Sequence, residues 1–330
     1  MKQIWIELVF VCLLVDSVAS KSPKTASNLW QGKPVTIMTF NTWQSGANVD
    51  DGINKIAKHI LQNDPDIVGV QEIGSREKIQ EMADALSRSS GRVWWYVHVE
   101  NSDRGLLTKH QINGDSIVRT GSAVGAQILF DDGRKATLYS LHLDYKSYGP
   151  YLTLFRTFNN FTFLDEVERN ITGRSVGITE LLASEGFQAA LANTETEPLF
   201  VVGDFNTPSH LDYTKEALSS RGFTFEWPAT QILQNSTGLV DSFREVHPDP
   251  VKHPGNTWST VWKTIADYEG FQYVIPEPQD RIDLILYKSS LLKTVSSESY
   301  AGDFVPKPQD VRHNDWPSDH YALVSTFKGV

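Results

Sequence analysis

Residues able to bind a cation or move a proton stand at the ends of short apolar stretches of this chain. Asn41 closes the stretch that begins at Val35, and Glu72 follows the stretch 66–71. Four further segments have the same form, and they carry His142, Asp204 with Asn206, Asp283, and Asp319 with His320. Loops at strand ends are where a rigid scaffold presents catalytic groups. These residues are therefore the candidates for chemistry.

Such residue types suit attack on a phosphodiester. The substrate is anionic, so a hard cation on a non-bridging oxygen neutralises the charge that develops during attack. Mg²⁺ prefers oxygen ligands and keeps several waters, so one or two carboxylates with Asn41 would suffice. The attacking water needs a base, and an imidazole held by a carboxylate can titrate near neutral pH. Both His320 and Asp204 are open as that base.

Each residue taken alone also has a structural explanation. Asn41 could cap a turn, Glu72 could be a solvated carboxylate, and His142 could be a hydrogen-bonded core histidine. Asp204 to Pro208 could be only a turn, because Asp, Asn and Pro favour turns. Asp319 could cap the entry to a strand.

The elements that must position these residues alternate between strand and helix. Apolar runs predict strands at 35–41, 66–71, 199–202, 281–287 and 321–327, and helical spacing or propensity predicts helices at 49–60, 77–88, 177–193 and 211–221. Between 93 and 143 the pattern is strand and turn, with a hairpin at Asp131-Asp132-Gly133. The expected fold class is α/β, with two packed sheets and helices outside them.

The six segments, in this order, resemble the signature set of the endonuclease/exonuclease/phosphatase superfamily, whose members include deoxyribonuclease I. The segments are Thr39 to Trp43, Gly69 to Glu72, Ser140 to Leu143, Val202 to Pro208, Arg281 to Ile285 and Pro317 to Tyr321. Together they span about residues 35–327. The resemblance implies a four-layer α/β sandwich, like that of deoxyribonuclease I, in which two stacked mixed sheets are flanked by helices and the site lies at one end.

The resemblance also implies roles. Glu72 matches the principal metal-binding glutamate and Asn41 its companion, with Asp319 a further metal-side carboxylate. Asp204 and Asn206 match the pair that orients the attacking water and holds the phosphate, and His142 matches a histidine that contacts the scissile phosphate. His320 matches the catalytic histidine, and Asp283 matches the carboxylate that polarises it. Mg²⁺ or Mn²⁺ is the implied cofactor.

Two segments rich in aromatic residues interrupt the strand–helix rhythm and are expected to be loops, at 145–174 and 247–279. One follows His142 and the other precedes Asp283, so both should border the site. Tyr148 and Tyr151 are the candidate substrate-binding residues, although a lid packed on the sandwich is an equal alternative. The substrate stays open among nucleic acid, a phospholipid head group and a small phosphodiester.

The N-terminus has the three-part form of a secretory signal peptide. An apolar run at 4–15 precedes small polar residues and a cleavage position after Ser20, so residues 1–20 are expected to be removed and 21–330 to form a single domain. No other run is long enough to span a membrane. Three sequons, at Asn160, Asn170 and Asn235, fit export. The protein is expected to be extracellular, with no obligate protein partner evident.

Composition excludes several classes of chemistry. The only cysteine is Cys12, inside the expected signal peptide, so thiolate zinc ligands, disulfides and a cysteine nucleophile are excluded from the mature chain. A formal net charge of −10 argues against a broad basic face for duplex nucleic acid. A serine hydrolase is disfavoured because no Gly-x-Ser-x-Gly elbow is present. The remaining hypotheses are a metal-dependent phosphoester hydrolase and a catalytically inactive secreted ligand-binding protein on the same scaffold.

Overall fold

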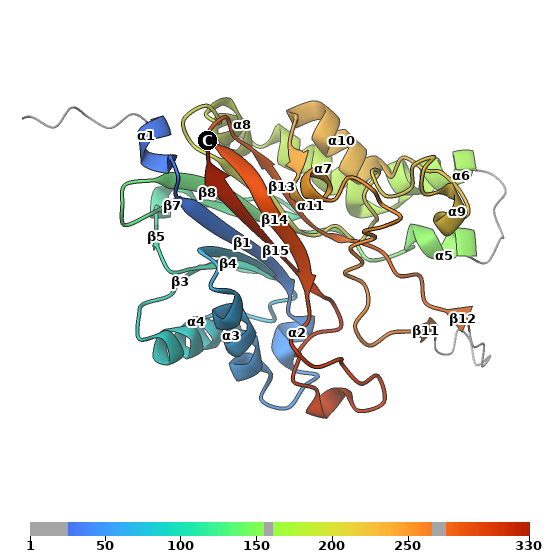
Figure 1. Cartoon of the computed structure of the whole chain (residues 1–330), viewed down its shortest axis with the longest axis horizontal. Helices are drawn as coiled ribbons and strands as arrows, with labels where there is room; N and C mark the ends of the chain where they lie inside the picture. The colour runs from blue at the N-terminus through green and yellow to red at the C-terminus, as the bar shows by residue number, and fades with distance from the viewer. Residues whose placement is uncertain (1–25, 155–160, 266–274) are drawn as a thin grey trace, which may run out of the picture.

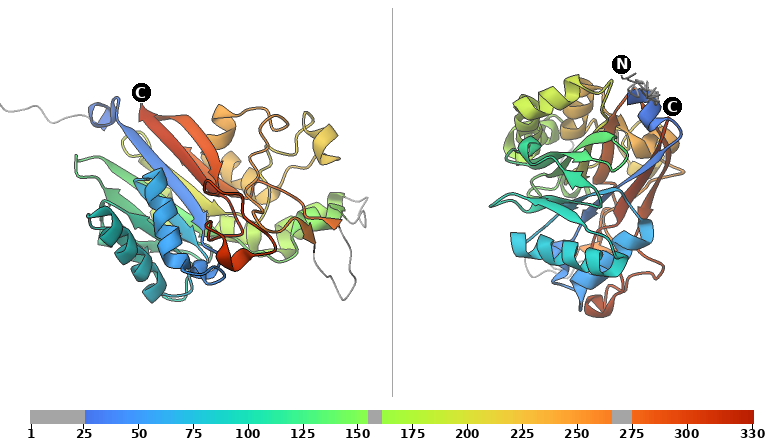
Figure 2. Two further views of the ribbon diagram at one scale, coloured as in Figure 1. Left: turned by 60° about the horizontal axis from the view of Figure 1, so that its bottom comes forward. Right: turned by 90° about the vertical axis from the view of Figure 1, so that its left-hand side faces the viewer.

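Two mixed β-sheets lie face to face with helices on their outer faces (Figures 1 and 2). The structure is a computed structural model and describes residues 26–154, 161–265 and 275–330. The order of layers is helices, sheet, sheet, helices, as expected of a four-layer α/β sandwich. The right-hand view of Figure 2 shows the two helical layers on opposite sides of the paired sheets.

The first sheet has six strands, and its two central strands are parallel. In spatial order the strands are β14 (Leu292–Tyr300), β15 (Ala322–Gly329), β1 (Pro34–Asn41), β2 (Ile67–Gln71), β4 (Arg104–Thr108) and β3 (Trp95–His98). The β1–β2 pair is parallel, whereas β1 and β15 are antiparallel and cross the middle of Figure 1 side by side. Residues that follow β1 and β2 therefore lie at the same end of the sheet as residues that precede β15.

The second sheet repeats this arrangement. Its strands are β10 (Val240–Asp241), β13 (Asp283–Lys288), β9 (Leu199–Asp204), β8 (Lys135–His142), β7 (Ala123–Leu129) and β5 (Gln111–Ile112), with β6 (Val118–Arg119) also paired to β7. The β8–β9 pair is parallel and β13 runs antiparallel to β9. In register, Asp204 is opposite both His142 and Asp283, so pairing alone brings these three residues to one edge.

One apolar cluster fills the space between the two sheets. Between the sheets, residues such as Ile37 and Leu323 meet Phe200 and Val202. Gln71 crosses the same interface with its side chain, which accepts from Thr39 and donates to Ser140. This buried amide ties the two sheets together directly below the strand ends that carry the candidate residues, so it limits sliding of one sheet over the other.

Helices cover the outer face of each sheet. The first sheet is covered by α3 (Gly52–Asn63) and α4 (Arg76–Ser90), through a cluster that includes Ile56, Ile60 and Met82. The second is covered by α7 (Gly173–Ala183), α8 (Glu185–Ala192) and α10 (Pro228–Thr237). The shorter helical segments are α1 (Ala26–Trp30), α2 (Trp43–Gly46), α5 (Gly149–Leu154), α6 (Phe161–Glu166), α9 (Leu218–Arg221) and α11 (Ser242–Val246), with a π-helical turn at Val167–Ile171 and 3₁₀ turns at Gly114–Ser116 and Val311–His313.

Two expected elements differ from the structure. The helix expected over 211–221 is formed only as α9, because Asp212 and Tyr213 turn inward to buried partners and the chain between them and α9 is a series of turns. The expected helix over 177–193 is two helices, α7 and α8, separated at Ser184. Tertiary contacts override helix propensity in the first case.

The aromatic segment 145–174 is not a loop over its described residues. It contains α5, α6 and the π-helical turn, fixed by a fully buried ion pair in which Arg174 lies 2.6 Å from Glu168. The other aromatic segment, 247–279, is irregular where it is described, apart from the two-residue strands β11 (Thr264–Ile265) and β12 (Ile275–Pro276). Both α5 and the β11–β12 hairpin lie at the right-hand end of Figure 1.

Candidate active site

Asp204 is the point at which the candidate side chains meet. It ends β9, and one carboxylate oxygen, Oδ2, lies 3.0 Å from Asn41 Nδ2, 3.6 Å from His142 Nε2 and 3.7 Å from His320 Nε2. The other oxygen accepts from the backbone N–H of Asn206. The carboxylate is buried, and burial raises the pKa of Asp204 to about 6 although His320 acts in the opposite direction.

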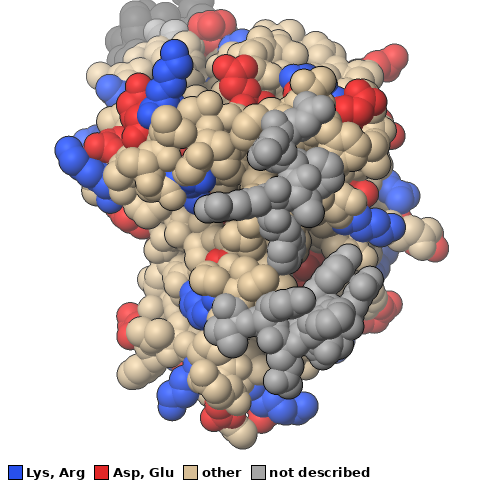
Figure 3. Space-filling model, turned by 90° about the vertical axis from the view of Figure 1, so that its right-hand side faces the viewer, with Lys and Arg blue, Asp and Glu red and all other residues tan. Residues whose placement is uncertain are grey.

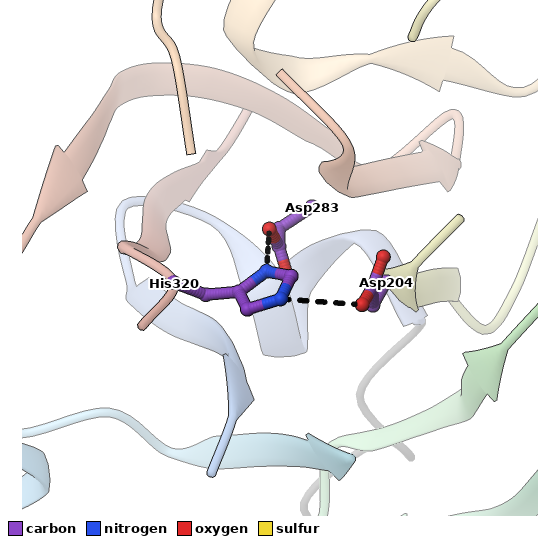
Figure 4. A group of neighbouring side chains, drawn as sticks. All are labelled: Asp204, Asp283 and His320. Carbon is purple, nitrogen blue, oxygen red and sulfur yellow. Dashed lines mark hydrogen bonds and ion pairs between the residues drawn. The ribbon is translucent and has the colours of Figure 1, made fainter. Parts of the chain in front are cut away.

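His320 lies between two carboxylates (Figure 4). Its Nδ1 is 2.9 Å from Asp283 Oδ2, and its Nε2 faces Asp204. Burial lowers the pKa of His320, but the charges of Asp283 and Asp204 outweigh burial and raise it to about 10. With Asp283 as acceptor, Nδ1 carries the proton and Nε2 points to the place where reacting atoms would sit.

Asp283 has no ion pair with its neighbour Arg281. That guanidinium is fully buried and bonds instead to Asp212 and Asp241. The two functions of this segment are thus separated, because Arg281 belongs to a buried structural network and Asp283 to His320.

A second histidine–carboxylate pair faces Asp204 from the opposite side. His142 Nδ1 lies 2.7 Å from Asp103 Oδ2. Burial lowers the pKa of His142, but the hydrogen bond from Asp103 and the charge of Asp204 raise it overall. The sequence did not point to Asp103, which lies in the polar run Glu100 to Arg104 and follows no apolar stretch. Only the antiparallel pairing of β4 with β2 places Asp103 near the site. In this pairing Arg104, the first residue of β4, lies opposite Gln71, which precedes Glu72.

A second group of carboxylates is joined to Asp204 through Asn41. It consists of Glu72 and Asp319. Glu72 accepts from Asn41 Nδ2 at 3.2 Å and from the backbone N–H of Gln44. Asn41 Oδ1 accepts from the backbone N–H of Trp43, so its amide nitrogen is the group turned to the carboxylates. Burial raises the pKa of Asp319 to about 6, and the charge of Glu72 acts in the same direction.

These residues fit a divalent cation. Asp319 Oδ1 is buried and has no hydrogen-bond partner, while Oδ2 accepts from the Trp262 indole. A buried carboxylate oxygen without a partner beside Glu72 is an unfavourable arrangement that a hard cation would relieve. The backbone of Glu72 is also left-handed, with φ 58°, a strain that recurs at functional sites.

Atoms of Asp204, Asp283 and His320 also lie within 4.8 Å of one another and could surround an ion. In that arrangement His320 would have to offer a ring nitrogen that carries no proton. An imidazole that carries protons on both nitrogens has no lone pair for a metal. The geometry therefore offers two possible places for a cation, and each has a buried carboxylate oxygen without a hydrogen-bond partner, Asp319 Oδ1 on the Glu72 side and Asp283 Oδ1 in the cluster.

Asn206, Tyr148 and Tyr151 border the same site. Asn206 has φ 49°, and its side chain donates to Leu143 O. Together with Tyr145, Trp258 and Ile282, these residues line a cavity of about 180 Å³. Trp258, which sequence reasoning did not single out, packs its ring on His320 with the centroids 4.8 Å apart. Every predicted site residue of the chemistry set is thus found at one end of the sandwich.

Features that bear on export lie elsewhere. Asn170 and Asn235 are exposed, whereas Asn160 and the expected signal peptide lie outside the described residues. Within the described ranges, no helix is long and apolar enough to cross a membrane.

A relative and several solved structures resemble the chain. An uncharacterized protein of Caenorhabditis elegans is 36% identical over 332 residues, covering 98% of each chain. The human Nocturnin catalytic domain, solved with a bound sulfate anion, matches with a TM-score of 0.54 at 18% identity over 93% of this chain and all of that one.

Two further structures have the same fold. An endonuclease/exonuclease/phosphatase from Beutenbergia cavernae has a TM-score of 0.54 at 15% identity, covering 90% of this chain and 72% of that chain. Truncated TDP2 from Caenorhabditis elegans has a TM-score of 0.51 at 16% identity, covering 91% and 99%. At these identities the likeness shows the fold.

The family model described as "Endonuclease/Exonuclease/phosphatase family" matches residues 38–320, which include every candidate residue from Asn41 to His320. Hydrolysis of phosphoester bonds is the chemistry of that family, and its members generally use a divalent metal. With the two-sheet sandwich and the convergence of carboxylates and histidines around Asp204, this chain belongs to the endonuclease/exonuclease/phosphatase family and is a phosphoester hydrolase.

Proposed function

We propose that this protein is a secreted phosphodiesterase that uses Mg²⁺ or Mn²⁺ and an activated water. The observation that carries the proposal is the position of Asp204 Oδ2, which two histidines approach to within 3.7 Å, each held by its own carboxylate. A full acid–base set assembled at one point is what catalysis needs. It is more than an inactive ligand-binding protein on the same scaffold would need.

The cation would be held by Glu72 and Asp319, with Asn41 beside them. When bound, it would neutralise charge on the phosphate. Asn41 Oδ1 becomes available as a ligand only if the amide turns away from Trp43 N. The unpartnered Asp319 Oδ1 supports this placement. Asp283 Oδ1 in the cluster of Asp204, Asp283 and His320 is buried without a partner too, so the metal requirement of an Asp283→Asn variant decides between the two positions.

The remaining residues act on the water and the phosphate. The water oxygen forms a bond to phosphorus, one P–O ester bond breaks, and the departing alkoxide takes up a proton. Asp204 and, in its neutral form, His320 are the two groups that can take the proton of the water; Asp204 Oδ2 and His320 Nε2 are 3.7 Å apart. His142 is placed to donate a hydrogen bond to a phosphate oxygen, and Asn206 lies on the same side as the aromatic cavity.

The net charge of the chain favours a substrate with one phosphodiester group over duplex nucleic acid. The chain has a formal net charge of −10, and affinity for a duplex comes largely from neutralised phosphates. Figure 3 shows Lys and Arg scattered among Asp and Glu on the visible part of one face, with no continuous basic area there. A phospholipid head group or a soluble diester has fewer charges to neutralise.

Export rests on the sequence. The signal-like segment 1–20 and the three sequons support secretion of residues 21–330, which we propose to be one catalytic domain with no obligate protein partner. Exposure of Asn170 and Asn235 is compatible with glycosylation of both.

The test is hydrolysis of bis(p-nitrophenyl) phosphate by the purified protein, after EDTA treatment and after addition of Mg²⁺ or Mn²⁺. We expect turnover with either ion and none in EDTA. The His320→Ala variant, purified in parallel, controls for a contaminating enzyme. Full turnover in EDTA, or no turnover of any phosphoester with either ion, contradicts the proposal. p-Nitrophenyl phosphate, a monoester, serves as the comparison substrate.

A further inference from the structure

A cavity lined mainly by aromatic residues opens beside His320. Its walls are Tyr145, Tyr148, Tyr151, Asn206, Trp258 and Ile282, and its volume is about 180 Å³. Because the Trp258 ring packs on His320 and Asn206 bonds to Asp204, a group attached to the reacting phosphate would reach it. Sites for whole small molecules have roughly 300–1,000 Å³, so this cavity suits one compact group of a substrate.

The polar tips of three of these rings are occupied. Tyr151 Oη donates to Glu277 at 2.5 Å, and Trp258 Nε1 donates to the same carboxylate at 2.8 Å. Tyr148 Oη donates to Asp280 at 3.0 Å. The rings are therefore fixed from behind, and they offer carbon faces and edges to the cavity rather than hydroxyl groups. Tyr148 and Tyr151 also meet edge to face, with their centroids 5.2 Å apart.

Asp280 and Glu277, the two carboxylates behind the rings, differ in whether a cation is paired with them. Asp280 is paired with Arg221 at 2.8 Å. Glu277 is 5% exposed, accepts only from the neutral groups of Tyr151 and Trp258, and has no ion pair among the described residues. When ionised, a buried carboxylate of this kind puts an uncompensated negative charge directly behind the aromatic wall. Burial raises the pKa of Glu277, so the ionised form is costly without a partner and a cation bound at the wall would favour it.

The aromatic walls and the buried carboxylate of Glu277 together favour binding of a cation that needs no hydrogen-bond acceptor. Ring faces attract cations through their quadrupole, and the uncompensated Glu277 adds to that attraction. A primary ammonium or a guanidinium would lose hydrogen bonds that it makes in water, because the polar atoms of Tyr148, Tyr151 and Trp258 are already bonded to Asp280 and Glu277. A quaternary ammonium makes no such bonds, so it loses nothing on entering. A nucleobase could stack here, but its polar edge would find few partners.

We propose that the cavity binds a quaternary ammonium group, so that the substrate is a choline-type phosphodiester. The proposal rests on the phosphodiesterase function proposed above and names its substrate class. The ammonium would lie against Tyr148, Tyr151 and Trp258, with Glu277 behind them. The phosphate would then lie near Asp204, on the side of the cavity formed by Asn206 and Trp258.

The test compares three p-nitrophenyl diesters with Mg²⁺ or Mn²⁺ present. They are p-nitrophenyl phosphocholine, its uncharged 3,3-dimethylbutyl isostere, and bis(p-nitrophenyl) phosphate as the reference substrate. We expect kcat/KM for the choline ester to exceed that for the isostere about tenfold, which corresponds to about 1.4 kcal/mol. Equal values for the two esters overturn the proposal and leave the phosphodiesterase function standing.

Two variants test whether the preference for the choline ester arises from the charge of Glu277. Glu277→Gln keeps the size of the side chain and removes its charge, so the choline-to-isostere ratio should fall to about twofold. The matched control is Glu197→Gln, since Glu197 is also buried, also accepts from neutral groups, and lies near the opposite end of β9. A ratio unaffected by Glu277→Gln overturns the proposal. Ratios are used because a general loss of folded enzyme cancels in them.

Wild-type measurements keep the proposal testable if that variant does not fold. Tetramethylammonium chloride should compete with the choline ester, whereas sodium chloride at the same ionic strength should not. A preference for thymidine 5′-(p-nitrophenyl phosphate) that Tyr151→Leu abolishes would make the cavity a base-stacking site and overturn the proposal. Glycerophosphocholine in solution and sphingomyelin in mixed micelles then distinguish a soluble source of the head group from a lipid one.

Failure of the two proposals can be told apart. No hydrolysis of any diester, by folded protein with metal, defeats the phosphodiesterase function. Calorimetric titration of the same protein with tetramethylammonium then decides the cavity by itself. Binding that Glu277→Gln weakens supports the inference, and absence of binding overturns it.

Discussion

His320 Nδ1 and Asp283 Oδ2 face each other at 2.9 Å, and both side chains are buried at the end of the sandwich. His320 precedes β15 in one sheet and Asp283 begins β13 in the other, so the pair also links the two sheets. The orientation that Asp283 gives the ring leaves Nε2 directed at Asp204, which makes the pair a positioned acid–base unit rather than a chance contact.

Glu72→Gln should raise the concentration of Mg²⁺ or Mn²⁺ needed for half-maximal activity at least tenfold. An amide is a weaker ligand for a hard cation than a carboxylate. The thermal stability of the metal-free protein should change little, because Glu72 is only partly buried and the amide oxygen of Gln can still accept one of its two hydrogen bonds, from Asn41 or from the backbone N–H of Gln44. Activity titrated with metal, beside a melting curve in EDTA, checks both statements. A large loss of metal-free stability would instead make Glu72 a structural residue.

The same titration on Asp283→Asn separates the two possible cation positions. If the cation lies beside Glu72 and Asp319, this variant should keep its metal requirement. If the cluster of Asp204, Asp283 and His320 holds the ion, the requirement should rise as much as in Glu72→Gln.

Asp103→Asn should lower the pKa of His142 in the metal-free protein. The bond and charge of Asp103 raise that pKa, and Asn keeps the shape while removing the charge, so the midpoint of the imidazole titration moves to lower pH. Turnover should fall about 10–100-fold, the usual effect of losing a group that orients a histidine. NMR titration of His142 is the readout that a purely structural role would not move.

The control for this change is Asp132→Asn, on the hairpin between β7 and β8. Burial raises the pKa of Asp132, but Lys33 and Arg134 outweigh it and lower the pKa to about 2, as His142 lowers that of Asp103. Removing the charge of Asp132 should leave both the pKa of His142 and turnover unchanged. If both variants shift His142 equally, Asp103 has no special part.

Arg281→Met should destabilise the fold by about 3–5 kcal/mol, the cost of breaking a buried ion pair from one side. Asp212 and Asp241 would lose their shared partner, although Arg244 still bonds to Asp212. Turnover per folded molecule should change much less than in Asp283→Asn. Urea denaturation with activity measured on the folded fraction tests this, and an intact melting transition with abolished turnover would show that Arg281 belongs to the active site.

Changing both Tyr148 and Tyr151 to Ala should alter the ranking among substrates while hydrolysis of a minimal phosphodiester survives. The two rings line the cavity, and their hydroxyl groups donate to Asp280 and Glu277. Relative kcat/KM across choline, uncharged and nucleoside diesters is the measurement. An equal loss on every substrate would mean that the segment around α5 is only a structural lid.

Local patterns were sufficient to predict the layers and the residues that end strands. Asn41, His142 and Asp204 follow apolar runs that form central strands, so their shared edge follows from pairing once the sheets exist. Family resemblance supplied the grouping of His320 with Asp283, which are far from the other residues in sequence. In the sandwich, His320 Nδ1 and Asp283 Oδ2 lie 2.9 Å apart.

Other features depend on contacts that no local pattern carries. Asp103 is an ordinary surface-like residue until β4 pairs with β2 and brings it to His142. Trp258 and Glu277 lie in irregular chain, and their roles arise from where that chain crosses the site. The missing helix at 211–217 has the same origin, because buried partners of Asp212 and Tyr213 outweigh local propensity.

The most direct test of the account is a double-mutant cycle on His320 and Asp283, measured as single-turnover hydrolysis of a phosphodiester at saturating metal. His320→Ala and Asp283→Asn should each reduce the rate by several orders of magnitude, since Asn at such a pair selects the wrong tautomer. Because the two residues act as a unit, the double variant should be hardly slower than the slower single variant. Losses that add in free energy would show that the two side chains work independently, and would contradict the pairing on which the proposed mechanism depends.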